Sequence, residues 1–337
     1  MIISADLFRS DELKAWAFNN IVSGKCEVSG KRDSLVDTAQ LSDFFSALFS
    51  LFEKDADGRG LFDAIQKDWK LFEDDHLSEV VLPALLHELG IPLAADTKVK
   101  YKNTVTEPCA RWIEIKTALR TERRFFAGDL IQDEDKWDVF FASNETIEEG
   151  SIFRRARIND DENKLYSTES ELGMPPADKA PAGRANTYGI PYLYLGDDEQ
   201  TVMYESRALV KDILSIASYR TTTDLDVVDF TFKPDLFGAY QQSEDGFMSD
   251  VQRYVFLNEV ARDLSKAVRR YDNKEIDYLP TQFVCEYIRL VTAAKGLIFQ
   301  SAQYPQGKNI VLFSDEKVHY MGVEHKVVGT VRMEYAR

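Results

Sequence analysis

The sequence predicts an α+β protein: a mostly helical N-terminal part followed by a mixed α+β domain. Three observations lead to this prediction. The chain has 337 residues, enough for two ordinary domains. Helical apolar spacing continues to about residue 146, and short β-type runs begin near residue 150. The pattern changes near Glu148-Glu149-Gly150, so we expect a helical domain at residues 1–147 and an α+β domain at 148–337.

The first part shows its clearest helical pattern at residues 40–52. One broad apolar face there is formed by Leu41, Phe44, Phe45, Leu48, Phe49 and Phe52. Gly90 and Pro92 follow a second helical segment in the usual order, although Pro83 inside it indicates a late start or a kink. The helices expected besides 40–52 cover residues 11–19, 60–72, 77–89, 109–123 and 134–142.

The second part alternates strands with helices. We expect strands at 152–153, 192–195, 216–219, 227–230, 297–299 and 310–313, and a final strand pair within 318–336. The expected helices run from Asp198 to about Leu209, over about 247–270, and onward from Pro280. Residues 159–190 are rich in Asp, Pro, Gly and Ala, which predicts a surface loop able to act as a lid.

Composition narrows the class of function. The formal net charge of -16 argues against non-specific nucleic-acid binding, which needs clustered Lys and Arg. Three scattered cysteines indicate a reducing compartment rather than a disulfide framework. No apolar run approaches the roughly 20 residues of a membrane span, and the N-terminus lacks the pattern of a secretory signal. We therefore expect a cytoplasmic protein that binds neither membrane nor nucleic acid.

A constellation of polar residues gives the strongest functional signal. Arg184, Tyr194 and Glu205 follow one another at intervals of ten and eleven residues, separated by a turn, a strand and the start of a helix. Ser301 comes directly after another apolar strand. Each residue alone also fits an ordinary role, as a loop arginine, a core tyrosine, a solvated glutamate or a turn serine. Together they could hold a phosphate, fix a flat ring and stabilise a cationic sugar.

These groups match the requirements for cutting the nicotinamide–ribose bond of NAD. The nicotinamide leaves without a general acid because it is already cationic in NAD. The difficult species is the oxocarbenium-like sugar, which a nearby carboxylate stabilises. An arginine grips the diphosphate in a bidentate way that lysine cannot match, and an aromatic ring holds a flat face.

Three segments carry a family resemblance: 183–207, 278–282 and 296–302. Together they resemble the RES domain family, named for its arginine, glutamate and serine, over about residues 150–315. The resemblance implies a fold similar to ADP-ribosyltransferases and no metal. By motif, it makes Arg184, Tyr194, Glu205 and Ser301 the catalytic residues, with Arg184, Tyr194 and Ser301 also binding NAD.

A further NAD-binding arginine is expected on the opening strand of such a domain. Arg154, Arg155 and Arg157 are the candidates here, and we choose Arg155 because it shares strand parity with Phe153. A charged edge strand that discourages aggregation is the alternative interpretation. After Arg184 the sequence departs from the commonest family pattern at Ala185-Asn186-Thr187-Tyr188, so the turn there is expected to differ.

The helical part more weakly resembles a HEPN-like domain found ahead of some RES domains. That resemblance rests on Cys26 and on the run 123–126. The sequence Cys26-Glu27-Val28-Ser29 lacks the second cysteine of a CxxC pair, which argues against a zinc site. None of the four histidines follows an arginine at the spacing of HEPN ribonucleases. We therefore expect a structural or partner-binding role for this part.

The function implied by the resemblance is NAD degradation, as a phosphorylase or a glycohydrolase. Inorganic phosphate or water would attack the sugar, with NAD as substrate. Such enzymes act as growth-arresting toxins or anti-phage defence effectors, so an antitoxin or another regulatory protein is an expected partner. A homo-oligomer stays open. The alternatives are a protein ADP-ribosyltransferase that uses NAD and a non-catalytic nucleotide-sensing or interaction module.

Overall fold

The computed structural model describes residues 1–94, 96–125, 130–131, 137–161, 163–266 and 273–330. The chain divides into two compact units, Met1–Ala110 with Lys233–Phe256, and Arg111–Phe232 with Leu257–Arg337. A segment remote in sequence thus joins the N-terminal residues, which the hydrophobic pattern did not indicate. The domain boundary at residue 147 stays a prediction. Among the helices of the described ranges, none is long and apolar enough to cross a membrane.

The first unit consists of short helices and two small sheets. Its helices are η1 (Ala5–Leu7), α1 (Asp11–Asn19), η2 (Thr38–Leu41), α2 (Ser42–Ser50), α3 (Leu61–Trp69), α4 (Asp75–Glu88) and α9 (Leu236–Gln242). One sheet pairs β1 (Ile2–Ser4) with β2 (Leu35–Asp37), and the other pairs β3 (Phe52–Gly60) with β4 (Lys98–Tyr101). Two helices, α5 (Asn103–Thr121) and α10 (Glu244–Leu264), have residues in both units.

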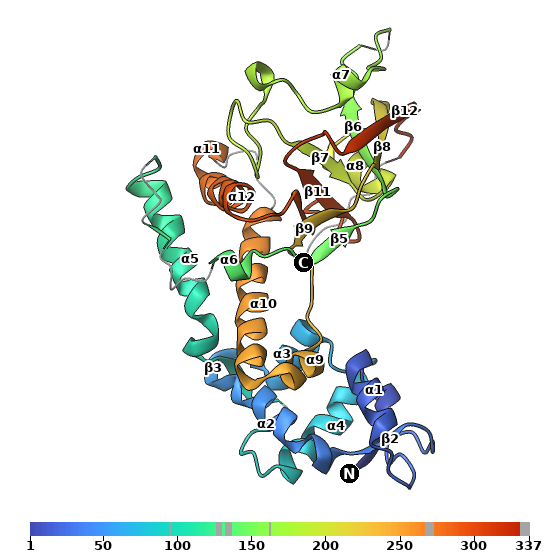
Figure 1. Ribbon diagram of the computed structural model, residues 1–337, viewed down its shortest axis with the longest axis vertical. Helices are drawn as coiled ribbons and strands as arrows, with labels where there is room; N and C mark the ends of the chain where they lie inside the picture. The colour runs from blue at the N-terminus through green and yellow to red at the C-terminus, as the bar shows by residue number, and fades with distance from the viewer. Residues whose placement is uncertain (95, 126–129, 132–136, 162, 267–272, 331–337) are drawn as a thin grey trace. The chain divides into compact units, whose positions relative to one another are not determined.

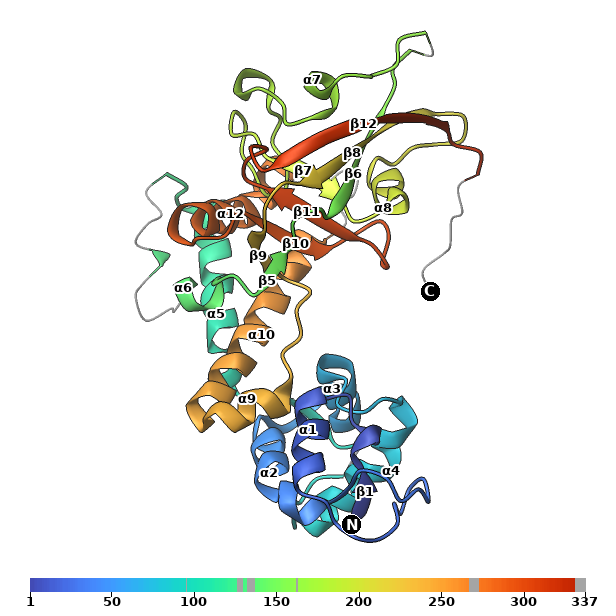
Figure 2. The same ribbon diagram turned by 45° about the vertical axis from the view of Figure 1, so that its right-hand side comes forward.

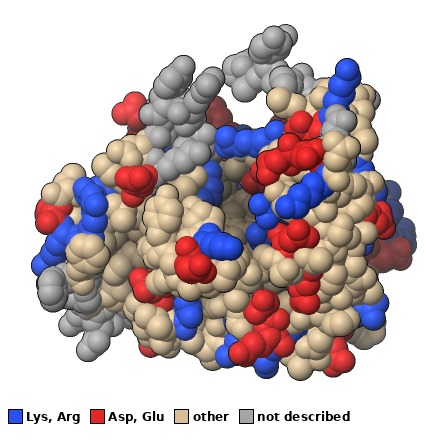
Figure 3. All heavy atoms as spheres, turned by 90° about the horizontal axis from the view of Figure 1, so that it is seen from above, with Lys and Arg blue, Asp and Glu red and all other residues tan. Residues whose placement is uncertain are grey.

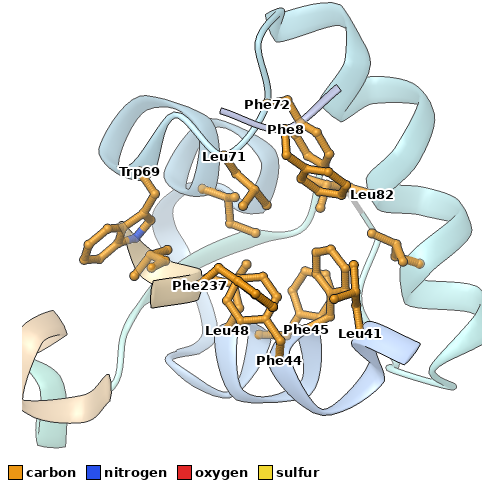
Figure 4. Packing of buried hydrophobic residues seen from close by; sticks show 14 of the residues in the cluster. Phe8, Leu41, Phe44, Phe45, Leu48, Trp69, Leu71, Phe72, Leu82 and Phe237 are labelled. Atoms are coloured by element: carbon orange, nitrogen blue, oxygen red, sulfur yellow. The ribbon is translucent and has the colours of Figure 1, made fainter. Parts of the chain in front are cut away.

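Aromatic side chains fill the core of the first unit (Figure 4). Phe8 stacks on Phe72 with ring centroids 5.1 Å apart, and Phe44 meets Phe237 edge-on at 5.2 Å. The apolar face predicted at 40–52 therefore does become buried, but α2 is shorter than that segment and Phe52 opens β3 instead. Helix α4 starts at Asp75, because Asp74 caps it by accepting from the backbone N–H of His76, and Pro83 lies within it.

An eight-stranded mixed sheet forms the centre of the second unit (Figures 1 and 2). Its order is β12-β8-β6-β7-β11-β10-β9-β5, in which β9 and β10 are parallel and the other neighbouring strands are antiparallel. The strands are β5 (Glu145–Ile147), β6 (Ile152–Ile158), β7 (Leu193–Gly196), β8 (Ile213–Thr221), β9 (Leu225–Asp229), β10 (Gly296–Gln300), β11 (Lys308–Leu312) and β12 (Val318–Val327). The predicted α+β class is confirmed.

Helices cover both faces of this sheet, as the alternation of side chains along β6 and β8 requires. On one face α8 (Glu199–Glu205) packs Val202 against Ile216 and its neighbours. On the other face, Leu172 of α7 (Glu169–Leu172) joins a cluster with Ala217 and Tyr219. The remaining helices of the unit are α6 (Trp137–Phe140), η5 (Ala177–Lys179), α11 (Lys274–Asp277) and α12 (Leu279–Val291).

Some predicted elements lie partly outside the described residues. Outside the described residues lie the start of the helix expected at 134–142, the end of the helix expected at 247–270 and the end of the strand pair expected at 318–336. Within 318–330 the structure has the single strand β12, which pairs with β8. The segment 159–190 is mainly irregular, as expected, but includes α7 and η5.

Candidate active site

A cavity of about 350 Å³ opens where β6 and β7 diverge. These strands pair only at Arg154 and Gly196. Beyond that point Arg155 of β6 and Tyr194 of β7 both line the cavity. Arg184 and Glu205 line it as well, together with nonpolar side chains such as Phe299 and Leu264. The structure therefore brings four of the five predicted site residues to the lining of one cavity. The fifth, Ser301, is not in the lining but donates a hydrogen bond to Glu205.

Two side chains hold the carboxylate of Glu205 in place. Glu205 is the last residue of α8, which begins after Asp198 caps it by accepting from the N–H of Thr201. Its Oε1 accepts from Ser301 Oγ at 2.6 Å and from Asn309 Nδ2 at 2.9 Å. Within the described ranges no hydrogen bond reaches Oε2. One oxygen is thus fixed, and the other is left for a ligand.

Ser301 is held in place by the turn that follows β10. Its Oγ accepts from the N–H groups of Gln303 and Tyr304 at 3.2 and 3.0 Å, and its own N–H donates to the carbonyl of Gly307. The residue is buried, with 4% of its surface exposed. The two backbone donors orient the hydroxyl so that its hydrogen goes to Glu205. Ser301 is therefore both a turn serine and a partner of the carboxylate.

Tyr194 uses its hydroxyl to hold the loop that carries Arg184. The phenol donates to Asn186 Oδ1 at 2.7 Å and accepts from the N–H of Ala185 at 3.1 Å. Burial raises the pKa of this phenol, so it stays protonated as the donor to Asn186. A Cβ on Gly183 would collide with the same hydroxyl, which explains the glycine there. The stacking role expected for Tyr194 stays a prediction.

Arg184 presents a cation that lacks a fixed partner among the described residues. Its guanidinium lies over the ring of Tyr278, 5.3 Å from the centroid, and forms no ion pair or hydrogen bond with the described part of the chain. Burial lowers its pKa, while Tyr278 and then Glu205 act in the opposite direction. The backbone is better anchored, because Thr281 Oγ1 donates to the carbonyl of Arg184 at 2.7 Å.

Arg155 bridges the gap between the diverging strands. Its Nη1 donates to the carbonyl of Tyr194 at 3.0 Å, and burial lowers the pKa of its guanidinium. The other two candidates point elsewhere. Arg154 donates to the carbonyl of Phe153, and Arg157 lies 3.8 Å above the ring of Tyr166. Of the three arginines proposed from the sequence, Arg155 is the one in the described lining of the cavity.

Sequence reasoning missed the residues that position this constellation. Asn309 is the second residue of β11, and the signal was a polar side chain directly before the apolar part of that strand. Gln282 lies in a segment that did carry the family resemblance, but no role was assigned to it. Its Nε2 donates to the carbonyls of Gly183 and Asn186 at 2.8 and 2.9 Å, so α12 holds the arginine loop.

The lining of the cavity is mixed in charge, with two arginines, Arg155 and Arg184, and one carboxylate, Glu205. In the view of Figure 3, Lys and Arg side chains border a hollow in the surface, and Asp and Glu lie nearby. Across the described ranges no group of three or more His, Cys, Asp or Glu is placed to hold a metal ion. In the first unit, Cys26 is buried and its Sγ accepts from the N–H groups of Ser4 and Ser29.

The fold and the site define a mixed-sheet domain in which a cavity is lined by the hydrogen-bonded carboxylate of Glu205 and by the half-buried Arg184. A family model described as the RES domain matches residues 154–331, more than half of the chain. The chain therefore belongs to the RES domain family, as the sequence predicted. This membership associates it with NAD-related toxin function and suggests an NAD-utilising enzyme. Comparisons with curated proteins and with solved structures found no match.

Proposed function

We propose that this protein cleaves the nicotinamide–ribose bond of NAD and transfers the ADP-ribosyl group to inorganic phosphate or water. The observation that carries the proposal is the Glu205 carboxylate, which two side-chain donors hold at the edge of a cavity. A surface glutamate would not need this arrangement. Fixing a carboxylate before the reaction is the way enzymes stabilise charge that develops in the transition state.

In this reaction the bond between the ribose carbon and the pyridine nitrogen breaks, and its electron pair goes to nicotinamide, which leaves neutral. Positive charge develops on the sugar ring, and the Glu205 carboxylate stabilises it. Ser301 and Asn309 occupy Oε1, so Oε2 remains for a ribose hydroxyl. A phosphate or water oxygen then bonds to the sugar carbon, and the attacking water loses a proton to solvent.

Arg184 supplies the positive charge for the diphosphate. Its guanidinium is half-buried and keeps its donors free of the described side chains, which leaves them for phosphate oxygens. The N-terminal end of α12 lies next to it, because Thr281 in the first turn bonds the carbonyl of Arg184. The partial positive charge of a helix N-terminus adds to the attraction for an anion.

Removal of NAD would make the protein a growth-arresting toxin or a defence effector, restrained by an antitoxin or another regulatory protein. The observation behind this second step is membership of a family associated with NAD-related toxins. Induced expression of the wild-type chain should stop bacterial growth and lower cellular NAD, whereas Glu205→Gln should do neither. Equal growth arrest by both proteins would contradict this proposal.

Purified protein and NAD labelled in the adenosine half test the reaction itself. Chromatography separates free ADP-ribose from its phosphate ester, and gel analysis detects labelled protein. Reactions with and without inorganic phosphate distinguish phosphorolysis from hydrolysis, and label on protein would indicate an ADP-ribosyltransferase instead. Glu205→Gln should abolish all products, and the exposed Glu149→Gln serves as the matched control. NAD left intact by the wild type, while calorimetry shows binding, would favour a sensing module and contradict the enzyme.

A further inference from the structure

A second and larger cavity, of about 780 Å³, lies in the same unit. Aromatic and aliphatic side chains dominate its lining, among them Tyr188, Tyr278, Leu279 and Phe283. Three charged side chains also line it and are exposed to solvent: the carboxylates of Glu275 and Glu286 and the guanidinium of Arg124. Its size and its apolar character with a few polar groups are typical of a small-molecule site. The steps proposed above make no use of it.

Arg184 connects this cavity with the one that contains Glu205. Arg184 itself lines the smaller cavity, and its guanidinium lies over the ring of Tyr278, which lines the larger one. The larger cavity is also lined by Gln282, which donates to the carbonyl of Gly183 beside Arg184. The arginine therefore stands between the two spaces. In a dinucleotide the diphosphate likewise stands between two nucleosides.

We infer that the larger cavity binds the adenosine half of NAD and that its carboxylates select NAD over NADP. The inference rests on the proposed function, because that function puts the nicotinamide ribose at Glu205 and the diphosphate at Arg184. The rings of Tyr188, Tyr278 and Phe283 offer faces and edges on which an adenine can stack. Glu275 and Glu286 can accept hydrogen bonds from ribose hydroxyls, as acidic residues do in other NAD sites. Their two negative charges outnumber the single positive charge of Arg124 in the lining, so the balance of charge disfavours a 2′-phosphate.

Part of this cavity comes from outside the RES domain match. Leu119 near the end of α5 lines it and is buried, yet it precedes residues 154–331. The helix before the family domain thus completes a binding surface for the substrate. This gives Leu119 of α5 a role in binding as well as in folding.

Calorimetry with two fragments tests the inference without turnover. Adenosine 5′-monophosphate represents the adenosine half of NAD, and adenosine 2′,5′-bisphosphate represents that of NADP. The wild type should bind the monophosphate more tightly. Tyr188→Ala should weaken that binding about tenfold, the effect of losing one stacked ring, and it should fold because Tyr188 is 70% exposed. Phe18→Ala, which removes an aromatic ring that is 74% exposed in α1, is the matched control and should change nothing.

A double variant tests whether the two carboxylates select NAD over NADP. Replacing both Glu275 and Glu286 with glutamine should bring the affinities for the two fragments closer together, while Glu149→Gln should leave their ratio unchanged. Unchanged fragment binding in Tyr188→Ala and in the double variant would overturn the inference.

Turnover separates this inference from the proposed function. Tyr188→Ala should lower kcat/KM for NAD but leave the cleavage of nicotinamide mononucleotide, which lacks the adenosine half, unchanged. An equal loss for both substrates would overturn the inference. If Glu205→Gln abolishes NAD cleavage while Tyr188→Ala does not affect it, the inference fails and the function stands. If the wild type binds adenosine 5′-monophosphate without cleaving NAD, and Tyr188→Ala loses that binding, the proposed function fails and the adenosine site stands.

Discussion

Asn309→Ala isolates the support that Glu205 receives from β11. The substitution removes the 2.9 Å hydrogen bond from Nδ2 to Oε1 and leaves the bond from Ser301 in place. The backbone of Asn309 stays in the sheet, opposite Phe299 of β10 and Gly196 of β7. Alanine fits that position, so the effect should appear in activity rather than in folding.

The structure sets the expected size of this effect. A hydrogen bond to a charged group contributes roughly 1.5–3 kcal/mol. Both Glu205 and Asn309 are partly exposed, so water replaces some of the lost bond and the low end applies. A loss of about 1.5 kcal/mol in transition-state stabilisation corresponds to about a tenfold lower kcat/KM for NAD. Asn309→Asp should lose more, because it puts a second carboxylate beside Glu205.

The comparison with Ser301→Ala separates positioning from stability. That variant removes the 2.6 Å bond to Glu205 and also leaves the N–H groups of Gln303 and Tyr304 without their acceptor. It should therefore lower both kcat/KM and the melting temperature, whereas Asn309→Ala should lower mainly kcat/KM. Initial rates of nicotinamide release and thermal melts provide both values. If Asn309→Ala and Asn309→Asp both release nicotinamide at the wild-type rate, the hydrogen bond from Asn309 does not position Glu205 for the reaction.

Further predictions concern the arginine loop and the first unit. Gly183→Ala should displace the loop, because its Cβ would meet the Tyr194 hydroxyl, and should raise KM for NAD in steady-state assays. Tyr194→Phe removes two hydrogen bonds and should cost about 1–3 kcal/mol in the free energy of unfolding, measured by urea denaturation, together with a higher KM; an unchanged midpoint would argue against the bonds. Arg184→Lys keeps the charge but loses bidentate binding, so KM for NAD should rise, and an unaltered KM would remove Arg184 from the phosphate site. Phe44→Ala should lower the free energy of unfolding by about 3–5 kcal/mol, yet kcat of the folded protein should stay at the wild-type value.

The fold was predictable wherever a hydrophobic pattern was strong. The strands β7, β8, β10 and β11 were indicated because each contains a short run of mainly nonpolar residues. The strand β3, with the sequence FEKDADGRG, is mainly polar and has Phe52 as its one buried residue, so no apolar pattern indicated it. The membership of Lys233–Phe256 in the first unit depends on contacts between distant residues, such as Phe44 with Phe237, which no local pattern encodes.

The sequence alone pointed to Arg184, Tyr194 and Glu205, which line one cavity, but not to all the residues that hold them in place. Arg184, Glu205 and Ser301 were proposed as site residues because their residue types fit the chemistry and their spacing fits a family. The hydrogen bonds from Asn309 to Glu205 and from Gln282 to the loop depend on side-chain geometry across separate elements. An Asn or Gln at the start of a strand or in a helix has many ordinary roles, so the residue type alone does not predict which group its amide will bond.

The central claim is that the clamped carboxylate of Glu205 lets this cavity break the nicotinamide–ribose bond. A proton NMR time course of NAD with purified wild-type protein and with Glu205→Gln measures this directly. We predict that free nicotinamide appears with the wild type and not with the variant, although both bind NAD. Equal nicotinamide release by the two proteins, or none from either, would contradict the claim.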